Sequence, residues 1–418
     1  MHKEQDRINR RNFLKTAGTA GLASALAGAV YAKTDDPNKT ATDASKSADR
    51  KQVPKYPQVP RRKLGKTEVE VPCLSLGAMF DIAENQIILK SCLDWGVHYW
   101  DTANSYAGGN SEIGIGKFLK KHPDVRKSLF IVSKASDARN PQTVEKRLQT
   151  SLERMNTSYI DLYYGVHGLR RPSQLTDELK QWVKSAKERK LIRFFGFSTH
   201  SNMADNLAAA SELDWIDVIM TTYNFRVMQD EKMQAAVEAC NKAGIALIAM
   251  KVMADGQEVK SEDDKELAGH FLARGFTQGQ AKIKAVLSDK RFSSACVQMR
   301  TVARLTENAA AVLDKTKLSA ADLDFLSQYA SLTCSGYCAG CANICERAAK
   351  MPYLADVMRC LMYYNSYGEP EMAREYFAMI PSAVRKRLTK ADYSLAEARC
   401  PQGLPIAKLM TEAVHKLA

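Results

Sequence analysis

Five of the cysteines in the C-terminal quarter are the residues with the clearest chemical meaning in this 418-residue chain. Three follow one another at short spacing, namely Cys338, Cys341 and Cys345; Cys334 precedes them, and Cys400 lies far downstream, directly before a proline. A dense run of thiolates completed by a distant Cys-Pro is typical of iron–sulfur ligand sets. We therefore predict a [4Fe-4S] cluster on the three closely spaced thiolates, with Cys334 and Cys400 competing for the fourth position.

Two other uses of clustered cysteines compete with this interpretation. A structural zinc site normally has two separated pairs of close cysteines rather than one dense row. Disulfides form in exported proteins, although cysteines this close in sequence make poor partners for one another. The metal and sulfide content of the protein distinguishes the three possibilities.

The N-terminus resembles an export signal. Residues 9–15 read Asn-Arg-Arg-Asn-Phe-Leu-Lys, a twin-arginine pattern, and a weakly apolar stretch rich in alanine and glycine follows at 16–31. This arrangement predicts a Tat signal peptide over residues 1–32, with delivery by the Tat translocon to the periplasm or another exported location. Tat export carries folded proteins, which suits a cluster that is inserted before export.

The charge and hydropathy of the chain limit the classes of partner that we expect. The formal net charge is +13, and residues 1–32 hold five basic and two acidic residues, so the remainder carries +10. A basic surface can steer anionic partners, but no basic and aromatic motif of a nucleic-acid-binding protein accompanies it. No segment is long and apolar enough for a confident membrane span, so we expect no integral membrane segment in the mature chain.

The order of apolar segments predicts an α/β fold. A polar flexible linker covers residues 33–60, and short apolar segments then alternate with amphipathic ones that have helical periodicity. The predicted strands are 71–77, 98–101, 129–134, 160–166, 193–198, 218–223, 245–251 and 295–299. Eight such strands separated by helices indicate a (β/α)8 TIM barrel over residues 61–314. The pattern then changes, and residues 315–418 are predicted to form a mainly helical, cysteine-rich domain.

Polar residues follow three consecutive predicted strands of the barrel. Asp101 ends one strand and Tyr106 lies in the next loop, whereas Lys134 and His167 end the following two strands. Because functional groups of such barrels gather at the C-terminal strand ends, we expect these four side chains to converge. A tyrosine beside a lysine cation is a general acid, since the cation lowers the tyrosine pKa. The set predicts carbonyl reduction by hydride transfer.

These residues resemble the aldo-keto reductase family. The similarity lies in the block Gly-Val-His-Tyr-Trp-Asp-Thr-Ala-Asn-Ser-Tyr at 96–106, and in 111–116, 132–134, 159–167 and 196–200, which follow in the family's order. The resemblance implies a barrel that binds NADP(H) or NAD(H) in extended form. It also implies Tyr106 as the proton donor within a catalytic tetrad completed by the other three strand-end residues.

The same resemblance implies the cofactor contacts and the nature of the tail. The residues implied to bind the nicotinamide cofactor are Ser198, Thr199, Tyr223, Lys251, Arg300 and Asn308. The C-terminal region resembles the ferredoxin-like iron–sulfur tail of one branch of the family, which the Cys-Pro at position 400 strengthens.

Together these features predict an exported oxidoreductase that interconverts a carbonyl and an alcohol. Its electrons are expected to pass between a nicotinamide in the barrel and the cluster, with a redox partner protein as the external donor or acceptor. The alternative is a non-catalytic electron-transfer or redox-sensing subunit built on a reductase barrel, against which the complete tetrad argues.

Overall fold

The computed structural model describes residues 54, 56–255 and 262–418. The predicted signal peptide and most of the predicted linker lie outside these residues. Residues 57–418 form one compact unit. Among the described residues, no helix is long and apolar enough to cross a membrane.

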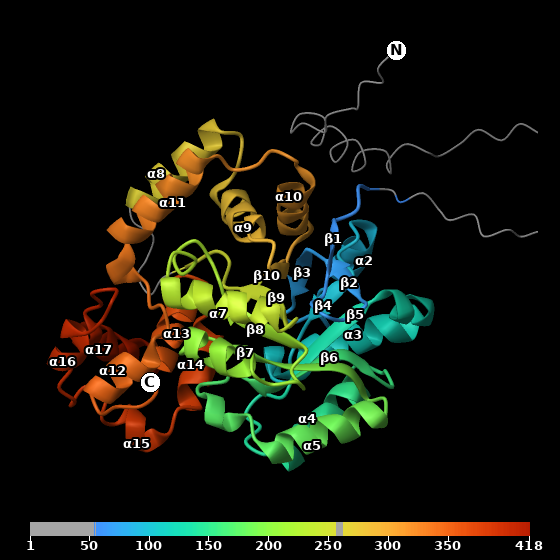
Figure 1. The fold of residues 1–418 in the computed structure, drawn as a ribbon, viewed down its shortest axis with the longest axis horizontal. Helices are drawn as coiled ribbons and strands as arrows, with labels where there is room; N and C mark the ends of the chain where they lie inside the picture. Colours follow the sequence, from blue (N-terminus) through green and yellow to red (C-terminus); the bar gives the residue numbers. More distant parts are fainter. Residues whose placement is uncertain (1–53, 55, 256–261) are drawn as a thin grey trace, which may run out of the picture. The chain divides into compact units, whose positions relative to one another are not determined.

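Eight parallel strands close into a barrel in the order β10-β3-β4-β5-β6-β7-β8-β9 (Figure 1). They are β3 (Leu74–Gly77), β4 (Tyr99–Asp101), β5 (Phe130–Lys134), β6 (Ile160–His167), β7 (Ile192–Thr199), β8 (Val218–Thr222), β9 (Ala246–Met250) and β10 (Phe292–Gln298). The barrel prediction is confirmed, and each strand falls within a few residues of its predicted position. The register aligns Asp101 with Val132 and His167 with Ser198, which brings the strand ends to one rim.

Helices pack around the outside of the barrel, as the amphipathic segments predicted (Figure 1). They are α2 (Ile87–Asp94), α3 (Asn110–Lys121), α4 (Pro141–Arg154), α5 (Asp177–Glu188), α6 (Met203–Ala210), α7 (Glu231–Lys242), α8 (Glu262–Ala273), α9 (Gln278–Ser288) and α10 (Val302–Leu313). Short 3-10 turns lie at η1 (Tyr106–Gly109), η2 (Pro123–Ser128), η3 (Pro172–Gln174) and η4 (Cys334–Gly336).

The start and the orientation of α4 follow from its sequence. Asn140 caps the helix because its side-chain oxygen accepts a bond of 2.9 Å from the Thr143 N–H, and a proline occupies the first turn, where no N–H is required. Val144 and Leu148, one turn apart, are both buried against the barrel. Local capping and a 3.6-residue period thus determine where this helix begins and which face it buries.

A short hairpin closes the barrel end opposite the strand C-termini. Strands β1 (Arg61–Lys63) and β2 (Glu70–Pro72) pair antiparallel. Leu64 and Val71 are fully buried and pack among the apolar side chains of the barrel interior, including Phe130 and Val218. The hairpin seals this end, so an approach to the strand-end residues lies at the other end.

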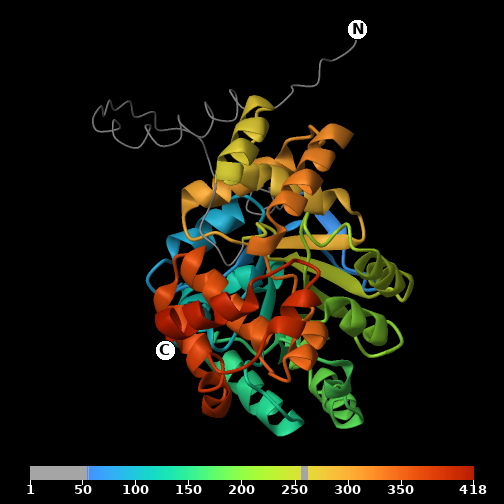
Figure 2. The ribbon, with the colours of Figure 1, turned by 90° about the vertical axis from the view of Figure 1, so that its left-hand side faces the viewer.

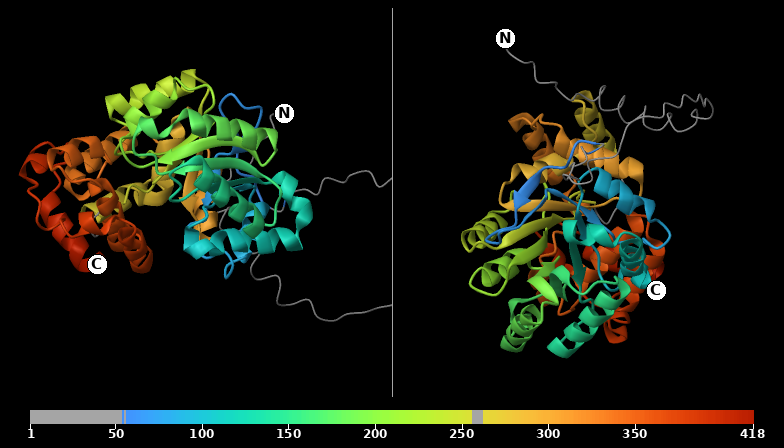
Figure 3. Two further views of the ribbon diagram at one scale, coloured as in Figure 1. Left: turned by 90° about the horizontal axis from the view of Figure 1, so that it is seen from below. Right: turned by 90° about the vertical axis from the view of Figure 1, so that its right-hand side faces the viewer.

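The C-terminal tail is helical, as predicted, and lies over that other end (Figures 2 and 3). Its helices are α11 (Ala320–Leu332), α12 (Ala342–Ala348), α13 (Leu354–Asn365), α14 (Pro370–Ala378), α15 (Ser382–Arg385), α16 (Ser394–Ala398) and α17 (Ile406–Leu417). Buried side chains of α13, α14 and α17, among them Leu361, Phe377 and Met410, form a core within the tail. Burying such side chains stabilises the tail by about 1.5–3 kcal/mol each relative to exposure.

One glycine lets the tail lie directly on the barrel. Gly340 has a positive φ of 78°, and a Cβ built there would lie 2.1 Å from the carbonyl oxygen of His200. The Gly340 carbonyl accepts a hydrogen bond of 2.8 Å from the N–H of Asn202. Any larger residue would force the cysteine-bearing loop away from the strand end, because both the contact and the backbone angle require glycine.

Candidate active site

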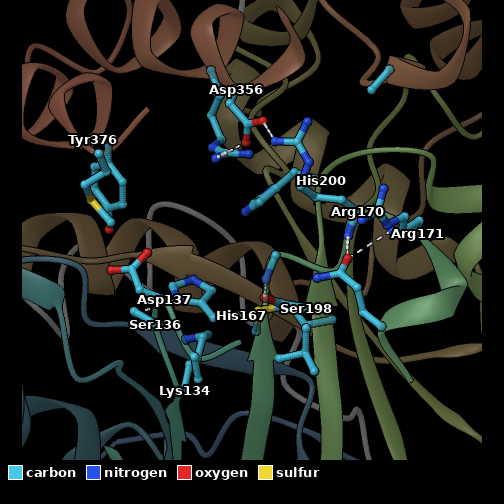
Figure 4. A pocket seen from close by; sticks show the side chains of 18 of the residues that line it. Lys134, Ser136, Asp137, His167, Arg170, Arg171, Ser198, His200, Asp356 and Tyr376 are labelled. Carbon is cyan, nitrogen blue, oxygen red and sulfur yellow. Dashed lines mark hydrogen bonds and ion pairs between the residues drawn. The ribbon is translucent and has the colours of Figure 1, made fainter. Parts of the chain in front are cut away.

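A cavity of about 1150 Å³ lies at the C-terminal ends of the strands, between the barrel and the tail. All four side chains of the predicted tetrad line it, namely Asp101, Tyr106, Lys134 and His167. Figure 4 shows Lys134 and His167 on its barrel side, with Tyr376 and Asp356 from the tail across the opening. The structure therefore brings residues of three consecutive strands together with residues from the C-terminal tail.

Asp101 and Lys134 form a buried ion pair at the base of the cavity. The Lys134 Nζ lies 2.5 Å from the Asp101 Oδ1 and donates a second bond of 2.7 Å to the carbonyl of Thr102. Both side chains are at most 3% exposed. Burial raises the pKa of Asp101, and the Lys134 charge opposes that rise. Because both side chains are buried, these bonds within the protein fix the orientation of the Lys134 ammonium group.

Tyr106 stands over this ion pair. The Lys134 Nζ lies 4.8 Å from the centroid of the Tyr106 ring. Burial raises the pKa of Tyr106 well above its usual value, and the Asp101 carboxylate raises it further. From the sequence we predict that Lys134 lowers the pKa of Tyr106. The structure differs because the cation is already paired with a carboxylate, so desolvation of the phenolate dominates.

His167 completes the group as a neutral imidazole. Its ring meets the Tyr106 ring edge-on, with centroids 5.9 Å apart, and its Nδ1 lies 2.7 Å from the hydroxyl of Ser136. Burial lowers the pKa of His167 well below its usual value, and the Lys134 charge lowers it further. A neutral imidazole can orient a carbonyl oxygen without competing as a strong acid.

Three of the implied cofactor residues lie on or near β7 and β8, and only one of them faces the cavity. Ser198 lines the cavity, and its hydroxyl accepts a bond of 3.0 Å from the N–H of Gly168. Thr199 is buried on the other side of the strand and donates to the carbonyl of Leu169. Tyr223 donates to Asp289 and stacks on a phenylalanine, away from the lining of the cavity.

A second cavity, of about 620 Å³, adjoins the first, and Lys251 lines both. The N-terminus of α9 contributes to its wall, and so do Arg304 and Glu307 of α10, whose side chains pair at 2.9 Å. Helix N-termini and guanidinium groups are the usual partners of phosphates, so this cavity suits the diphosphate part of a dinucleotide. Burial lowers the pKa of Lys251 to about 7.

The other two implied cofactor residues lie outside the lining of this second cavity. Arg300 pairs with Glu369 of the tail. Asn308 is buried, and within the described part of the chain its side-chain nitrogen has no hydrogen-bond partner. The sequence interpretation missed Arg304, although its place one turn after the helix cap Thr301 was a usable signal.

A third, smaller cavity is lined by four thiols. They are Cys338, Cys341, Cys345 and Cys400, and the rest of the wall is largely apolar. Burial raises the pKa of Cys338, and the other three thiols lie close enough to raise it further. Burial and the neighbouring thiols thus favour the neutral form of Cys338 when no cation is bound.

Cys334 lies apart from this group. It begins the 3-10 turn η4 and is not among the residues that line the thiol cavity, whereas Cys400 is. Of the two candidates for a fourth ligand, the structure therefore places Cys400 beside the other three. In the described ranges, no three His, Cys, Asp or Glu side chains are grouped as the ligands of one metal ion.

The family model of the aldo/keto reductase family matches residues 75–327. The chain is 28% identical over 230 residues to the NADP(+) aldo-keto reductase yakc of Schizosaccharomyces pombe, which covers 49% of this chain and 65% of that protein. It thus spans just under two-thirds of that relative's length. It is 23% identical over 291 residues to L-galactose dehydrogenase of Arabidopsis thaliana, covering 62% and 89% of the two chains.

A solved structure shares the barrel. The thermostable aldo-keto reductase that was solved in complex with the inhibitor epalrestat superposes with a TM-score of 0.55 at 26% sequence identity. The match covers 65% of this chain and 100% of that chain. About a third of the present chain thus has no counterpart in that structure.

Proposed function

This chain belongs to the aldo/keto reductase family, and we propose that it interconverts a carbonyl compound and an alcohol with NADP(H) or NAD(H). The observation that carries the proposal is the buried pair of Asp101 and Lys134 beneath Tyr106 in one cavity. His167 joins them there. These are the groups that a hydride transfer to a carbonyl requires for its proton.

The nicotinamide group supplies a hydride to the carbonyl carbon when it is bound. Tyr106 carries its proton at neutral pH, as an ordinary phenol does, and lines the cavity where it can donate that proton to the carbonyl oxygen as negative charge develops. Lys134 stabilises the resulting phenolate, and Asp101 holds Lys134 in place. His167 orients the carbonyl oxygen, and the tail over the mouth limits the access of water.

The chain's own residues fit a dinucleotide. Ser198 lies in the catalytic cavity, and Lys251 lies where the two cavities meet. Arg304 and the N-terminus of α9 line the second cavity and suit the phosphates.

The test is a direct one on the purified full chain. We expect NADPH or NADH to bind, as measured by its fluorescence, and to be oxidised when an aromatic aldehyde is added. Arg304→Met should weaken cofactor binding by about 10-fold or more, while the surface variant Arg374→Met should bind normally. Absence of binding by either cofactor to the native chain would remove the proposal.

The four thiols support a [4Fe-4S] cluster as a second redox group. Each iron of such a cluster takes one thiolate, so the ligands surround a cavity rather than converge on one ion. Cys338, Cys341, Cys345 and Cys400 line one cavity in this way. When bound, the cluster supplies single-electron transfer, which would connect the barrel to an external redox partner protein.

Export by the Tat translocon to the periplasm is part of the proposal and rests on the sequence of residues 1–32 alone. Changing both Arg10 and Arg11 to lysine should leave unprocessed chain in the cytoplasm, while changing the nearby Lys15 to arginine should not. Fractionation with mass spectrometry of the N-terminus measures this. Normal export of the double variant would contradict it.

A further inference from the structure

The tail forms the wall of the catalytic cavity that faces the tetrad. Helix α13 contributes Asp356, Arg359 and Tyr363 to this wall, and α14 contributes Tyr376. The barrel and the tail thus each supply one wall of the same cavity.

Asp356 is shared between two arginines. Its Oδ1 accepts a bond of 2.8 Å from the Nη2 of Arg359, and its Oδ2 pairs with the Nη1 of Arg170. Arg170 has a second carboxylate, since its Nη2 bonds both oxygens of Glu346 at 3.0 and 3.1 Å. Arg170 is therefore neutralised by two carboxylates, whereas Arg359 holds one oxygen of a single, shared carboxylate.

The positive charge of Arg359 is only partly neutralised by Asp356, and the side chain faces the cavity. Its side chain is 22% exposed and lines the cavity. The positive charge of Arg359 also acts on His200, which lines the same cavity. Burial lowers the pKa of His200 well below its usual value, and the charge of Arg359 lowers it further. The Nζ of Lys251 also lines this side of the cavity and donates to the Tyr363 hydroxyl at 3.0 Å. Figure 4 shows Asp356 and His200 at the edge of this space.

We propose that Arg359 is an anion-binding residue of the substrate pocket and that the substrate carries a carboxylate remote from its reacting carbonyl. A guanidinium binds a carboxylate through two parallel N–H donors, and the bond to Asp356 holds Arg359 in orientation for this. Asp356 is a positioning residue. The assignment of a substrate class rests on the proposed reductase function, but the anion site itself does not.

A matched pair of aldehydes tests the site. Para-formylbenzoate and para-formylbenzamide have nearly the same shape and the same reacting group, and differ in charge. The native chain should prefer the acid by about 10- to 100-fold in kcat/KM, the range of a charge-assisted hydrogen bond. Arg359→Met should remove most of this preference through a raised KM for the acid, and Arg359→Lys should keep part of it. Arg374→Met, on the outer face of the tail, should keep the full preference.

Calorimetric titration of both compounds in the absence of nicotinamide separates the two proposals. Tighter binding of the acid that Arg359→Met abolishes, without turnover in any assay, would support the anion site and refute the reductase function. Turnover of both aldehydes with no preference for the acid would support the reductase and overturn the anion site. An equal loss for acid and amide in Arg359→Met would also overturn it, because that pattern indicates a collapsed pocket.

Discussion

The catalytic cavity and the thiol cavity are built in different ways. In the first, Asp101, Lys134 and His167 come from three strands, and only the closed barrel brings them to one rim. In the second, three of four thiols come from one short segment, and only Cys400 arrives from a distance. The barrel site therefore depends on topology, whereas the thiol site depends mainly on local spacing.

The two cavities share a wall one helix thick. One face of α13 presents Asp356, Arg359 and Tyr363 to the catalytic cavity, and the opposite face presents Leu354 and Met358 to the thiol cavity. Because the period of an α-helix is 3.6 residues, a single helix can serve both sites. A substitution on one face of α13 can therefore affect the cavity on the opposite face.

The largest expected effect is at the barrel site. Tyr106→Phe should lower carbonyl reduction by about 10²–10⁴-fold because the proton donor is lost, with nicotinamide binding retained. Steady-state reduction of an aromatic aldehyde measures it. Tyr159→Phe is the control, since that ring packs on Arg126 outside the cavity. Near-normal reduction by Tyr106→Phe would exclude its role.

The thiol site predicts a contrast between two single substitutions. Cys400→Ser should lose most of the iron and sulfide, while Cys334→Ser should retain about four irons per chain. The reason is that Cys400 lines the thiol cavity, whereas Cys334 does not. Iron, sulfide and zinc analysis after anaerobic purification measures it. The reverse order, or stoichiometric zinc without sulfide, would contradict the assigned ligand set.

The raised pKa of Tyr106 predicts how rate depends on pH at the barrel site. Reduction uses the protonated phenol, so its rate should stay level between about pH 7 and pH 9. Alcohol oxidation needs the phenolate, so it should rise about tenfold per pH unit over the same range without reaching a plateau. A plateau near neutral pH would mean that Lys134 lowers this pKa after all.

The smallest expected effect is at the shared wall. Asp356→Asn leaves Arg170 and Arg359 without their common carboxylate, and should lower the free energy of unfolding by about 1–3 kcal/mol. Thermal or urea denaturation measures it. Asp214→Asn, which breaks an exposed pair with Lys180, should change stability by less than about 1 kcal/mol. Equal losses in the two variants would contradict the special role of Asp356.

Much of the fold and half of the site were predictable because they rest on local periodicity. The eight strands were found from apolar segments that alternate with amphipathic ones, and the strand-end rule located the tetrad. The position of Thr199 could also have been predicted from the alternation of side chains along a strand. Successive side chains of a strand face opposite sides, so Ser198 and Thr199 could not both face the cavity.

By itself the sequence determined the positions of the strands, the polar residues at their ends and three of the four clustered thiols, because each is a feature of a short segment of the chain. Tertiary structure alone decided which distant cysteine joins them, since Cys400 reaches the thiol cavity only when the tail is folded. It also decided the pKa of Tyr106, which rises because the residue is buried and Lys134 is already paired with Asp101. Burial and long-range pairing are properties of the packed chain, and no spacing pattern contains them.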